Sequence, residues 1–301
     1  MEILKKRVMA AAKINLFLDV TGRRDNGYHT INSIMHTVSL SDTVDIEVDR
    51  NGSGRITLTC SDTSLPTGEK NLAYRAAALF LSETGLSLDV SINIDKHIPM
   101  AAGLAGGSAD AAAVFRGLNE LCGGYLPQDE LCRIGSRLGA DIPFCIVGGS
   151  CAVSGIGEIL EDAPPMPECT IVIACAGEGV STPAAYGALD AAHGNFALGA
   201  YSEEREKYDR LAVSLENRDI GGVCENMFNL FEEVILPERP VARRIKELLE
   251  ESGAIRAMMS GSGPSVFGIF EKGDTEKINA AVLSLAKEGI VAHVCEPIYK
   301  L

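Results

Sequence analysis

The sequence predicts a two-domain protein of the α+β class, and three observations support this. A chain of 301 residues is long enough for two domains, and 46% hydrophobic residues supply a sizeable core. Segments with strand periodicity alternate with segments of helical periodicity. The segment EDAPPMPE, residues 161–168, interrupts this pattern, because its three prolines disfavour regular structure. We therefore expect one domain over residues 1–163 and a second over residues 164–301.

The first elements are predicted to be strands. Residues 8–20 alternate, with Ile14 and Leu16 on one face and Lys13 and Asn15 on the other, which predicts a half-buried strand. Further elements follow in order: strands over residues 43–48 and 55–59 around the turn RNGSG, a helix over residues 71–81, and a strand over residues 88–94.

The next predicted element is a helix that begins around Ser108. Val114, Leu118 and Leu121 recur at i, i+4 and i+7, and two glycines then end the pattern. The remaining elements are, in order, a helix from about Pro127 to the LGA before Asp141, a strand at TIVIACA (170–176), several helical stretches, a strand at PSVFGIF (264–270), a helix from about Asp274, and a last strand near Ile290.

The composition excludes several classes of protein. A net charge of −14 disfavours binding to nucleic acid or to an anionic membrane, because both are repelled by the field of the whole chain. Nine cysteines without a CxxC pair are typical of reduced thiols in a cytoplasm, and the N-terminal segment has no export signal. The histidines show no i,i+4 metal spacing, and we expect His36, His97, His193 and His293 to be structural or surface residues.

A glycine-rich stretch, IPMAAGLAGGSADAAA (98–113), lies between a predicted strand and a predicted helix. Such a turn exposes backbone N–H groups beside the positive end of the helix dipole, so it can hold a phosphate even in an acidic protein. We expect Ser108 to be the N-cap of this helix. The stretch matches neither GxxxxGK[ST] nor GxGxxG, which disfavours a P-loop enzyme or a dinucleotide-binding fold, and no GxSxG motif is present.

Three segments together resemble the GHMP kinase family, which includes galactokinase, homoserine kinase and mevalonate kinase. They are AAAKINLFLDVTGRRDNGYH (10–29), PMAAGLAGGSADAAA (99–113) and MMSGSGPSVFGIF (258–270), and the resemblance spans nearly the whole chain. Ala11 and Ala105 depart from the family pattern, where a proline and a glycine are usual. Ala105 keeps its backbone N–H, so the loop tolerates it unless the position requires a positive φ.

The resemblance implies the GHMP kinase fold, with an N-terminal domain like ribosomal protein S5 domain 2, a ferredoxin-like C-terminal domain and an active site between them. It also implies transfer of the γ-phosphoryl group of ATP to a hydroxyl group, with Mg²⁺ as the metal. Lys13 and Asp141 match the catalytic lysine and aspartate. Taken alone, Lys13 is more typical of a solvated lysine and Asp141 of a helix cap.

The nucleotide contacts implied by the resemblance lie in the glycine-rich stretch and at one further position. They are Pro99, Met100, Ala101, Ala102, Gly103, Leu104, Ala105, Gly106, Gly107, Ser108 and Asn71. The Ser108 hydroxyl is also the expected metal ligand. Asn71 is equally well explained as a helix cap. We expect Gly261, Ser262 and Gly263 to support the phosphate loop, although a simple hairpin turn also explains them.

The combination of AKINLFL, GRR, GYH and GADIPF resembles those family members whose acceptor is a cytidine diphosphate-linked alcohol. This resemblance implies that Tyr28 stacks on the cytosine ring, that His29 reads its edge, that Tyr186 is the second stacking face and that Asn15 also binds the acceptor. Without the family, Tyr28 is a surface aromatic residue and Tyr186 a core residue.

Two other functions are compatible with the sequence. One is a GHMP kinase for another small alcohol, such as homoserine or mevalonate, which GYH and GRR disfavour. The other is a nucleotide-binding regulator without turnover, which the presence of both Lys13 and Asp141 disfavours. The sequence does not settle the oligomeric state.

Overall fold

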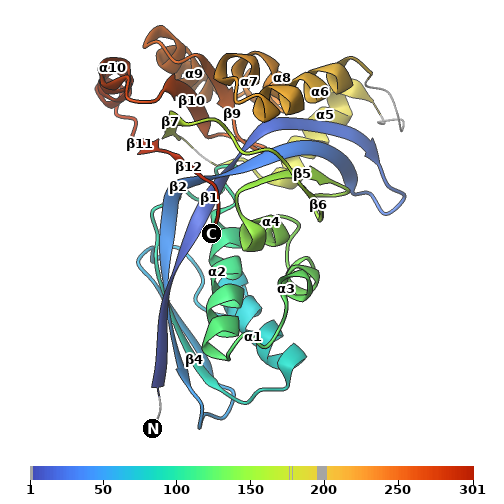
Figure 1. Ribbon diagram of the computed structural model, residues 1–301, viewed down its shortest axis with the longest axis vertical. Coiled ribbons are helices and arrows are strands. Elements are labelled where there is room, and N and C mark those ends of the chain that lie inside the picture. Colours follow the sequence, from blue (N-terminus) through green and yellow to red (C-terminus); the bar gives the residue numbers. More distant parts are fainter. Residues whose placement is uncertain (1–2, 176, 178, 195–201) are drawn as a thin grey trace.

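Two long antiparallel strands, β1 (Ile3–Arg23) and β2 (His29–Asp49), form the centre of the larger sheet of the molecule. The computed structural model describes residues 3–175, 177, 179–194 and 202–301. The chain begins at the far end of this sheet, and its C-terminus lies near the middle of the molecule (Figure 1).

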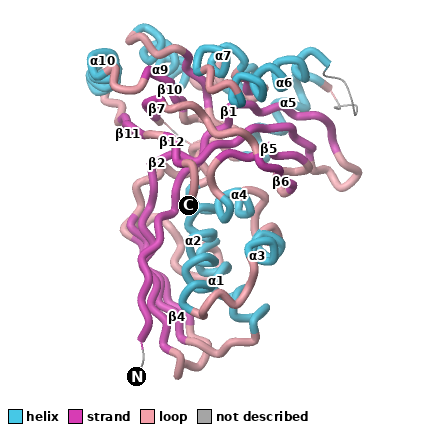
Figure 2. The backbone as a smooth tube through the Cα atoms, viewed as in Figure 1, coloured by secondary structure: helices cyan, strands magenta, loops and turns pink. Residues whose placement is uncertain are grey.

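Six shorter strands join the first sheet: β3 (Ile56–Cys60), β4 (Asp89–Asp95), β5 (Ser150–Ser154), β6 (Ile159–Asp162), β8 (Phe228–Asn229) and β12 (Pro297–Ile298). The main order is β3-β4-β2-β1-β8; β5 and β12 also pair with β2, and β6 pairs with β5. Four helices lie on one side of this sheet (Figures 1 and 2): α1 (Leu72–Thr84), α2 (Gly106–Leu121), α3 (Gln128–Gly135) and α4 (Ile142–Val147).

The predicted half-buried strand is more deeply buried than expected. Strand β1 covers residues 8–20 as predicted, but both of its faces are buried over residues 10–20, including Lys13, Asn15 and Asp19. The expectation of one exposed face was wrong because the C-terminal half of the chain covers it. On that side Phe17 meets Tyr208 edge to face, with ring centroids 5.3 Å apart.

The second sheet is formed by β7 (Cys169–Ala174), β9 (Arg256–Met259), β10 (Val266–Glu271) and β11 (Ala292–Cys295), in the order β11-β7-β10-β9 with every neighbouring pair antiparallel. Helices α9 (Pro240–Glu251) and α10 (Thr275–Lys287) pack on it. Its strands and these two helices follow the β-α-β-β-α-β order of a ferredoxin-like sheet, which confirms that prediction. Four helices lie between β7 and α9 in the described chain: α5 (Thr182–His193), α6 (Ser202–Glu216), α7 (Ile220–Asn226) and α8 (Glu232–Ile235).

Most predicted elements are present, with shifted ends. The helix predicted to run up to Asp141 ends at Gly135, and α4, which the sequence did not predict, begins directly after Asp141 with Pro143 in its first turn. Ala176, the last residue of the strand predicted at 170–176, lies outside the described residues. In the described part of the chain, no helix is long and apolar enough to cross a membrane.

The predicted domain boundary between residues 163 and 164 stays a prediction. The chain changes from the first sheet to the second between β6 and β7, close to this boundary. However, two later strands, β8 and β12, return to the first sheet. The two halves of the chain are therefore interleaved through β1 and β2.

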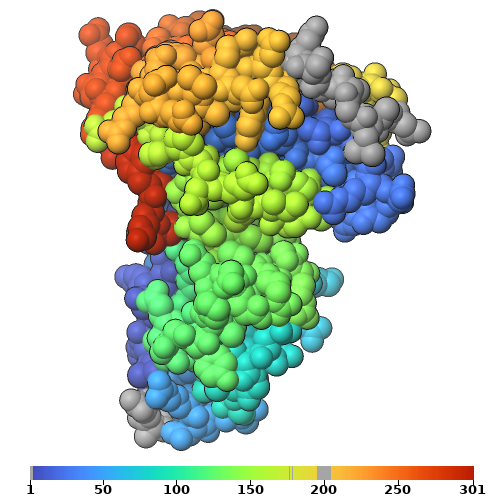
Figure 3. Space-filling view, turned by 45° about the vertical axis from the view of Figure 1, so that its right-hand side comes forward, coloured from blue at the N-terminus to red at the C-terminus, as the bar shows by residue number. Residues whose placement is uncertain are grey.

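The C-terminal tail packs against the first sheet and α4. In the space-filling view, the last residues (red) lie against the green surface of the N-terminal half (Figure 3). The Leu301 side chain fills the space beside Gly148, where a Cβ atom would lie 2.5 Å from it. The Tyr299 ring meets the buried His36 ring edge to face at 6.0 Å. His36 Nδ1 donates to the carbonyl oxygen of Thr37 at 2.8 Å, and burial lowers the pKa of His36 to about 4.

His36 predicts a loss of stability in mild acid. Its folded-state pKa lies below the ordinary value of about 6.5, so the unfolded chain binds the additional proton and stability falls as the pH drops from 6.5 towards 4. Between pH 7.5 and pH 5 this group should reduce the free energy of unfolding by about 2 kcal/mol. Urea titrations at both pH values should show a smaller acid loss in His36→Gln than in the wild type, and equal losses would contradict this assignment.

Candidate active site

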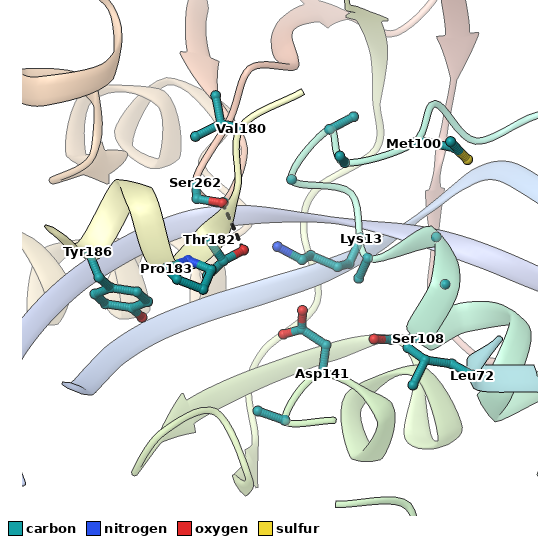
Figure 4. A pocket seen from close by; sticks show the side chains of 18 of the residues that line it. Lys13, Leu72, Met100, Ser108, Asp141, Val180, Thr182, Pro183, Tyr186 and Ser262 are labelled. Carbon is teal, nitrogen blue, oxygen red and sulfur yellow. Dashed lines mark hydrogen bonds between the residues drawn. The ribbon is translucent and has the colours of Figure 1, made fainter. Parts of the chain in front are cut away.

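A single cavity of about 1170 Å³ brings most of the predicted site residues together. Its walls come from β1, the β1–β2 turn, the glycine-rich loop, the first turn of α2, the start of α4, and α5. Figure 4 shows the Lys13 and Asp141 side chains pointing into the same space, with Ser108 beside Asp141. The volume is at the upper end of ordinary ligand sites, so there is room for a nucleotide and a second substrate.

The glycine-rich loop forms one wall of the cavity. Of the predicted nucleotide contacts in it, Leu104 alone does not line the cavity: its side chain is buried in the core, and its carbonyl oxygen accepts from the Lys13 backbone N–H at 3.2 Å. Helix α2 begins at Gly106, so Ser108 lies inside its first turn and the prediction of Ser108 as N-cap was wrong. The N-cap is Ala105, whose side chain cannot cap, and the first N–H groups of α2 therefore face the cavity without a side-chain cap.

Two alanines in this loop adopt a conformation that favours glycine. Ala101 has φ 48° and Ala105 has φ 59°, both in the left-handed region. A Cβ atom is strained there, at about 1–2 kcal/mol per residue. From the sequence, we expect the loop to tolerate Ala105 unless the position requires a positive φ. The position does require one, so Ala105 is strained. The loop keeps its shape because neighbouring segments hold it.

The turn between β9 and β10 holds the loop from the other half of the chain. Ser260 Oγ donates to the carbonyl oxygen of Gly103 at 3.0 Å, and a Cβ atom on Gly103 would lie 2.0 Å from the Ser260 carbonyl oxygen. A Cβ atom on Gly261 would lie 3.1 Å from Lys13 Nζ. The Ser262 hydroxyl lies 3.3 Å from that of Thr182, as the dashed line in Figure 4 shows. This segment is both a hairpin turn and a support of the loop, so the two explanations of residues 261–263 are compatible.

A buried ion network, which the sequence analysis did not predict, holds the two ends of the loop. Lys96 Nζ donates to an Asp42 carboxylate oxygen and, at 2.8 Å, to Asp110 in α2. The other Asp42 oxygen accepts from the backbone N–H groups of His97, at 2.5 Å, and Ile98, at 2.8 Å. Burial, opposed by the Lys96 ammonium, raises the pKa of Asp110. The network connects β2, the segment before the loop and the helix after it.

Lys13 is buried at the bottom of the cavity. Its Nζ donates to Asn15 Oδ1 at 2.6 Å, and the Asn15 amide in turn bonds Ser33. Burial lowers the pKa of Lys13, and the nearby Asp141 carboxylate opposes this effect. Asp141 occupies the N-cap position of α4, but its side chain makes no capping hydrogen bond and instead faces the cavity. The helix-cap explanation therefore does not account for its carboxylate.

The oxygen atoms near Asp141 suit a magnesium ion that is bound together with a nucleotide. Ser108 and Asp141 both line the cavity and present oxygen atoms, the ligands that Mg²⁺ prefers. Among the described residues, no cluster of three or more His, Cys, Asp or Glu side chains could hold a metal by itself. Sites that use one or two protein oxygens plus substrate phosphates are typical of Mg²⁺ in phosphotransferases.

Asn71 has a structural role that the sequence analysis considered. Its Oδ1 accepts from the backbone N–H of Ala73 at 2.9 Å, which caps α1, and its Nδ2 donates to the carbonyl oxygen of Pro66 at 2.9 Å. Asn71 also lines the cavity. The capping role is confirmed, and a contact with adenine stays a prediction.

Three of the four predicted acceptor residues, Tyr28, His29 and Tyr186, line the cavity together, and Tyr186 lies on the side opposite Met100 (Figure 4), whereas Asn15 lies beside Lys13. Tyr28 is 60% exposed at the rim of the cavity, whereas His29 is buried and its ring stacks on Tyr186 with centroids 4.5 Å apart. His29 Nε2 lies 2.8 Å from an Asp190 carboxylate oxygen, and Arg23 lies 3.2 Å from the other. Asp190, which the sequence analysis did not single out, therefore joins the β1–β2 turn to α5.

Comparisons with known proteins identify the family of the chain. The family model described as "GHMP kinases N terminal domain" matches residues 71–149, and "GHMP kinases C terminal" matches residues 211–287. A 4-diphosphocytidyl-2-C-methyl-D-erythritol kinase of Caldicellulosiruptor saccharolyticus is 43% identical over 95% of this chain and 96% of its own. The enzyme of the same name from Exiguobacterium sibiricum is 42% identical over 88% of both chains.

Solved structures give the same result for the fold. A crystal structure of 4-(cytidine 5'-diphospho)-2C-methyl-D-erythritol kinase superposes with a TM-score of 0.78 at 29% identity, covering 97% of this chain and 99% of the other. Homoserine kinase from Cytophaga hutchinsonii superposes with a TM-score of 0.76 at 20% identity, covering 98% and 95% of the two chains, and supports the fold alone.

The strain at Ala105 predicts a stabilising substitution. Ala105→Gly removes the strained Cβ at a cost in chain entropy of about 0.5–1 kcal/mol, so it should raise the free energy of unfolding by about 0.5–1 kcal/mol. Ala109→Gly, four residues on in the regular part of α2, is the matched control and should lower the stability by about 1 kcal/mol. Chemical denaturation of both variants checks this, and a loss of stability in both would show that Ala105 is not strained.

Proposed function

The chain belongs to the GHMP kinase family, and we propose that it transfers the γ-phosphoryl group of ATP to the 2-hydroxyl of 4-diphosphocytidyl-2-C-methyl-D-erythritol, a step of non-mevalonate isoprenoid precursor biosynthesis. Two observations together carry this proposal. The cavity contains Lys13 and Asp141 beside the uncapped start of α2, and relatives with the name of this kinase are about 40% identical to the chain.

In this proposal the triphosphate of ATP lies along the glycine-rich loop. The N–H groups of Gly106, Gly107 and Ser108 at the start of α2 bind phosphate oxygens, and the helix dipole favours the negative charge. The open space beside Gly107 supports this position of the phosphates. A Cβ atom on Gly107 would meet no atom closer than 3.7 Å, so no protein group crowds its backbone. The adenine lies near Asn71 and Met100, at the same end of the cavity.

The chemical step uses Lys13 and Asp141. Phosphoryl transfer depends mainly on positioning and on stabilising charge on the transferred group. The Lys13 ammonium stabilises that charge. The Asp141 carboxylate orients the acceptor hydroxyl and receives its proton as the bond to phosphorus forms. A water-poor site strengthens both interactions, since Lys13 is only 4% exposed.

We propose that Ser108, together with the phosphates of ATP, holds Mg²⁺. Bound there, the ion would neutralise part of the charge on the β- and γ-phosphates. The nine cysteines are free thiols, four of them partly buried and five buried, which supports a cytoplasmic location for the enzyme.

The acceptor end is proposed to hold the cytosine ring. Tyr28 offers an exposed ring face at the rim, and Tyr186 supplies a second aromatic wall that is buried against His29 and Phe231. Because His29 Nε2 already meets Asp190, we do not assign that nitrogen to the base. Reading of the base edge by His29 stays a prediction, as does a direct contact of Asn15 with the acceptor.

An ATP-consumption assay across several acceptors tests the proposed function. The panel contains the cytidine diphosphate-linked methylerythritol, free methylerythritol phosphate, homoserine and mevalonate. Only the first should be turned over. Turnover of homoserine or mevalonate would favour another small-alcohol kinase, and ATP binding without any turnover would favour a nucleotide-binding regulator.

Tyr28→Ala separates acceptor binding from ATP binding. Loss of a stacking face of about 1–3 kcal/mol should raise the KM for the acceptor about 5- to 150-fold and leave the KM for ATP unchanged. Tyr125→Ala is the control, because Tyr125 is similarly exposed, at 55%, and does not line the cavity. A rise in the KM for ATP instead would mean that Tyr28 contacts the nucleotide, and would contradict its assignment to the acceptor.

Asp141→Asn separates chemistry from binding. The amide keeps the size of the side chain but loses its charge and basicity, so the rate of phosphoryl transfer should fall about 10²- to 10⁴-fold with little change in either KM. Single-turnover measurements with saturating substrates check this, with circular dichroism to confirm folding and Asp129→Asn, outside the cavity, as the control. A folded variant within about twofold of the wild-type rate would remove Asp141 from the catalytic residues.

A further inference from the structure

A chain of buried hydrogen bonds runs from Lys13 to the backbone of its own strand. Lys13 Nζ donates to Asn15 Oδ1 at 2.6 Å, Asn15 Nδ2 donates to Ser33 Oγ at 2.9 Å, and Ser33 Oγ donates to the carbonyl oxygen of Phe17 at 2.5 Å. Asn15 and Ser33 have no exposed surface. If one of these hydrogen bonds is removed, bulk water therefore cannot reach the remaining group to replace it.

The far end of this chain determines the orientation of the Asn15 amide. A carbonyl oxygen only accepts hydrogen bonds, so Ser33 must give its one hydroxyl hydrogen to Phe17. The Ser33 oxygen can then only accept, and it requires a donor from Asn15. The amide consequently turns its NH₂ group to Ser33 and its oxygen to Lys13.

The amide orientation matters because Lys13 is a buried cation. Burial lowers its pKa, and the Asp141 carboxylate, which precedes α4, opposes this effect. An acceptor oxygen at 2.6 Å further favours the charged ammonium. A reversed amide would present N–H groups to the ammonium instead, which disfavours the charge and displaces the side chain.

A shift in strand register helps to place Ser33. Asn15 pairs with Met35, but Phe17 pairs with Ile34 and Leu18 with Ser33, so β1 contains one additional residue at this point. Bulges of this kind redirect side chains beside active sites. Strand β5 covers the other edge of β2 here, since Ser33 also pairs with Val153.

We propose that Ser33 is a positioning residue for phosphoryl transfer: its hydroxyl fixes the Asn15 amide with Oδ1 towards Lys13, and so holds the Lys13 ammonium aimed into the cavity. This inference rests on the proposed function, because it assigns Ser33 to the step in which Lys13 takes part. It adds no contact between Ser33 and either substrate.

Ser33→Ala tests the inference by removing the group that sets the amide orientation. We expect kcat to fall about 5- to 150-fold, the cost of leaving the buried Asn15 NH₂ group without its acceptor, with both KM values within about twofold of the wild type. Ser150→Ala is the matched control, because Ser150 lies in the same sheet and its buried hydroxyl makes no hydrogen bond to the described residues. An unchanged kcat in Ser33→Ala would overturn the proposal.

A double-mutant cycle with Asn15→Asp distinguishes positioning from a general structural effect. A carboxylate has no NH₂ group, so there is no orientation left for Ser33 to select. In the Asn15→Asp background, adding Ser33→Ala should therefore change kcat by less than about twofold. An additional fall as large as in the wild-type background would mean that Ser33 acts only through local packing, and would overturn the proposal.

A measurement without substrate keeps this inference separate from the proposed function. The Lys13 signal in [ε-¹³C]lysine NMR spectra, assigned by its loss in Lys13→Arg, can be followed against pH in the free protein. Its midpoint should be lower in Ser33→Ala than in the wild type and Ser150→Ala, and equal midpoints would overturn the positioning role. If the wild type fails to phosphorylate any acceptor, the proposed function fails, while this titration still tests the control of Lys13 by Ser33.

Discussion

The burial of one cation, the Lys13 ammonium, is the constraint on which the rest of the site depends. An ammonium group taken out of water is costly unless acceptors and negative charges surround it. Here an amide oxygen of Asn15 lies at 2.6 Å and the Asp141 carboxylate faces the same cavity. The turn from the second half of the chain comes so close that Gly261 has no room for a side chain, since its Cβ atom would lie 2.8 Å from the Gly103 carbonyl oxygen and 3.1 Å from Lys13 Nζ.

Much of the fold was predictable because local patterns and tertiary structure agree. The helix over residues 71–81, the strand over residues 88–94 and the strand at PSVFGIF are all present, and each has a clear periodicity or a glycine or cap at its end. The exposed face expected for residues 8–20 is absent because Tyr208 and Phe228, more than 180 residues later, cover it. No local pattern in β1 could indicate that partner.

Those site residues that lie in sequence motifs were also predictable. Lys13, Ser108, Asp141 and Tyr28 lie in recognisable motifs, and the cavity contains all four. The network of Asp42, Lys96 and Asp110 was missed because its members are charged residues in ordinary contexts, 54 and 14 positions apart, that meet only in the folded sheet. The error at Ser108 has a different cause: the N-cap is Ala105, three residues earlier, because Gly106 and Gly107, whose type suggested a turn, form the first turn of the helix.

The late return of β8 and β12 to the first sheet has a consequence for how this protein is made. Residues 228–229 pair with β1 and residues 297–298 with β2, so these two strands wait for partners that are synthesised more than 200 residues later. During translation the long β1–β2 hairpin emerges with these positions unpaired, and unpaired strand edges are the surfaces through which nascent chains associate wrongly. The sheet that carries Lys13 is therefore complete only after residues 297–298 have left the ribosome and reached β2.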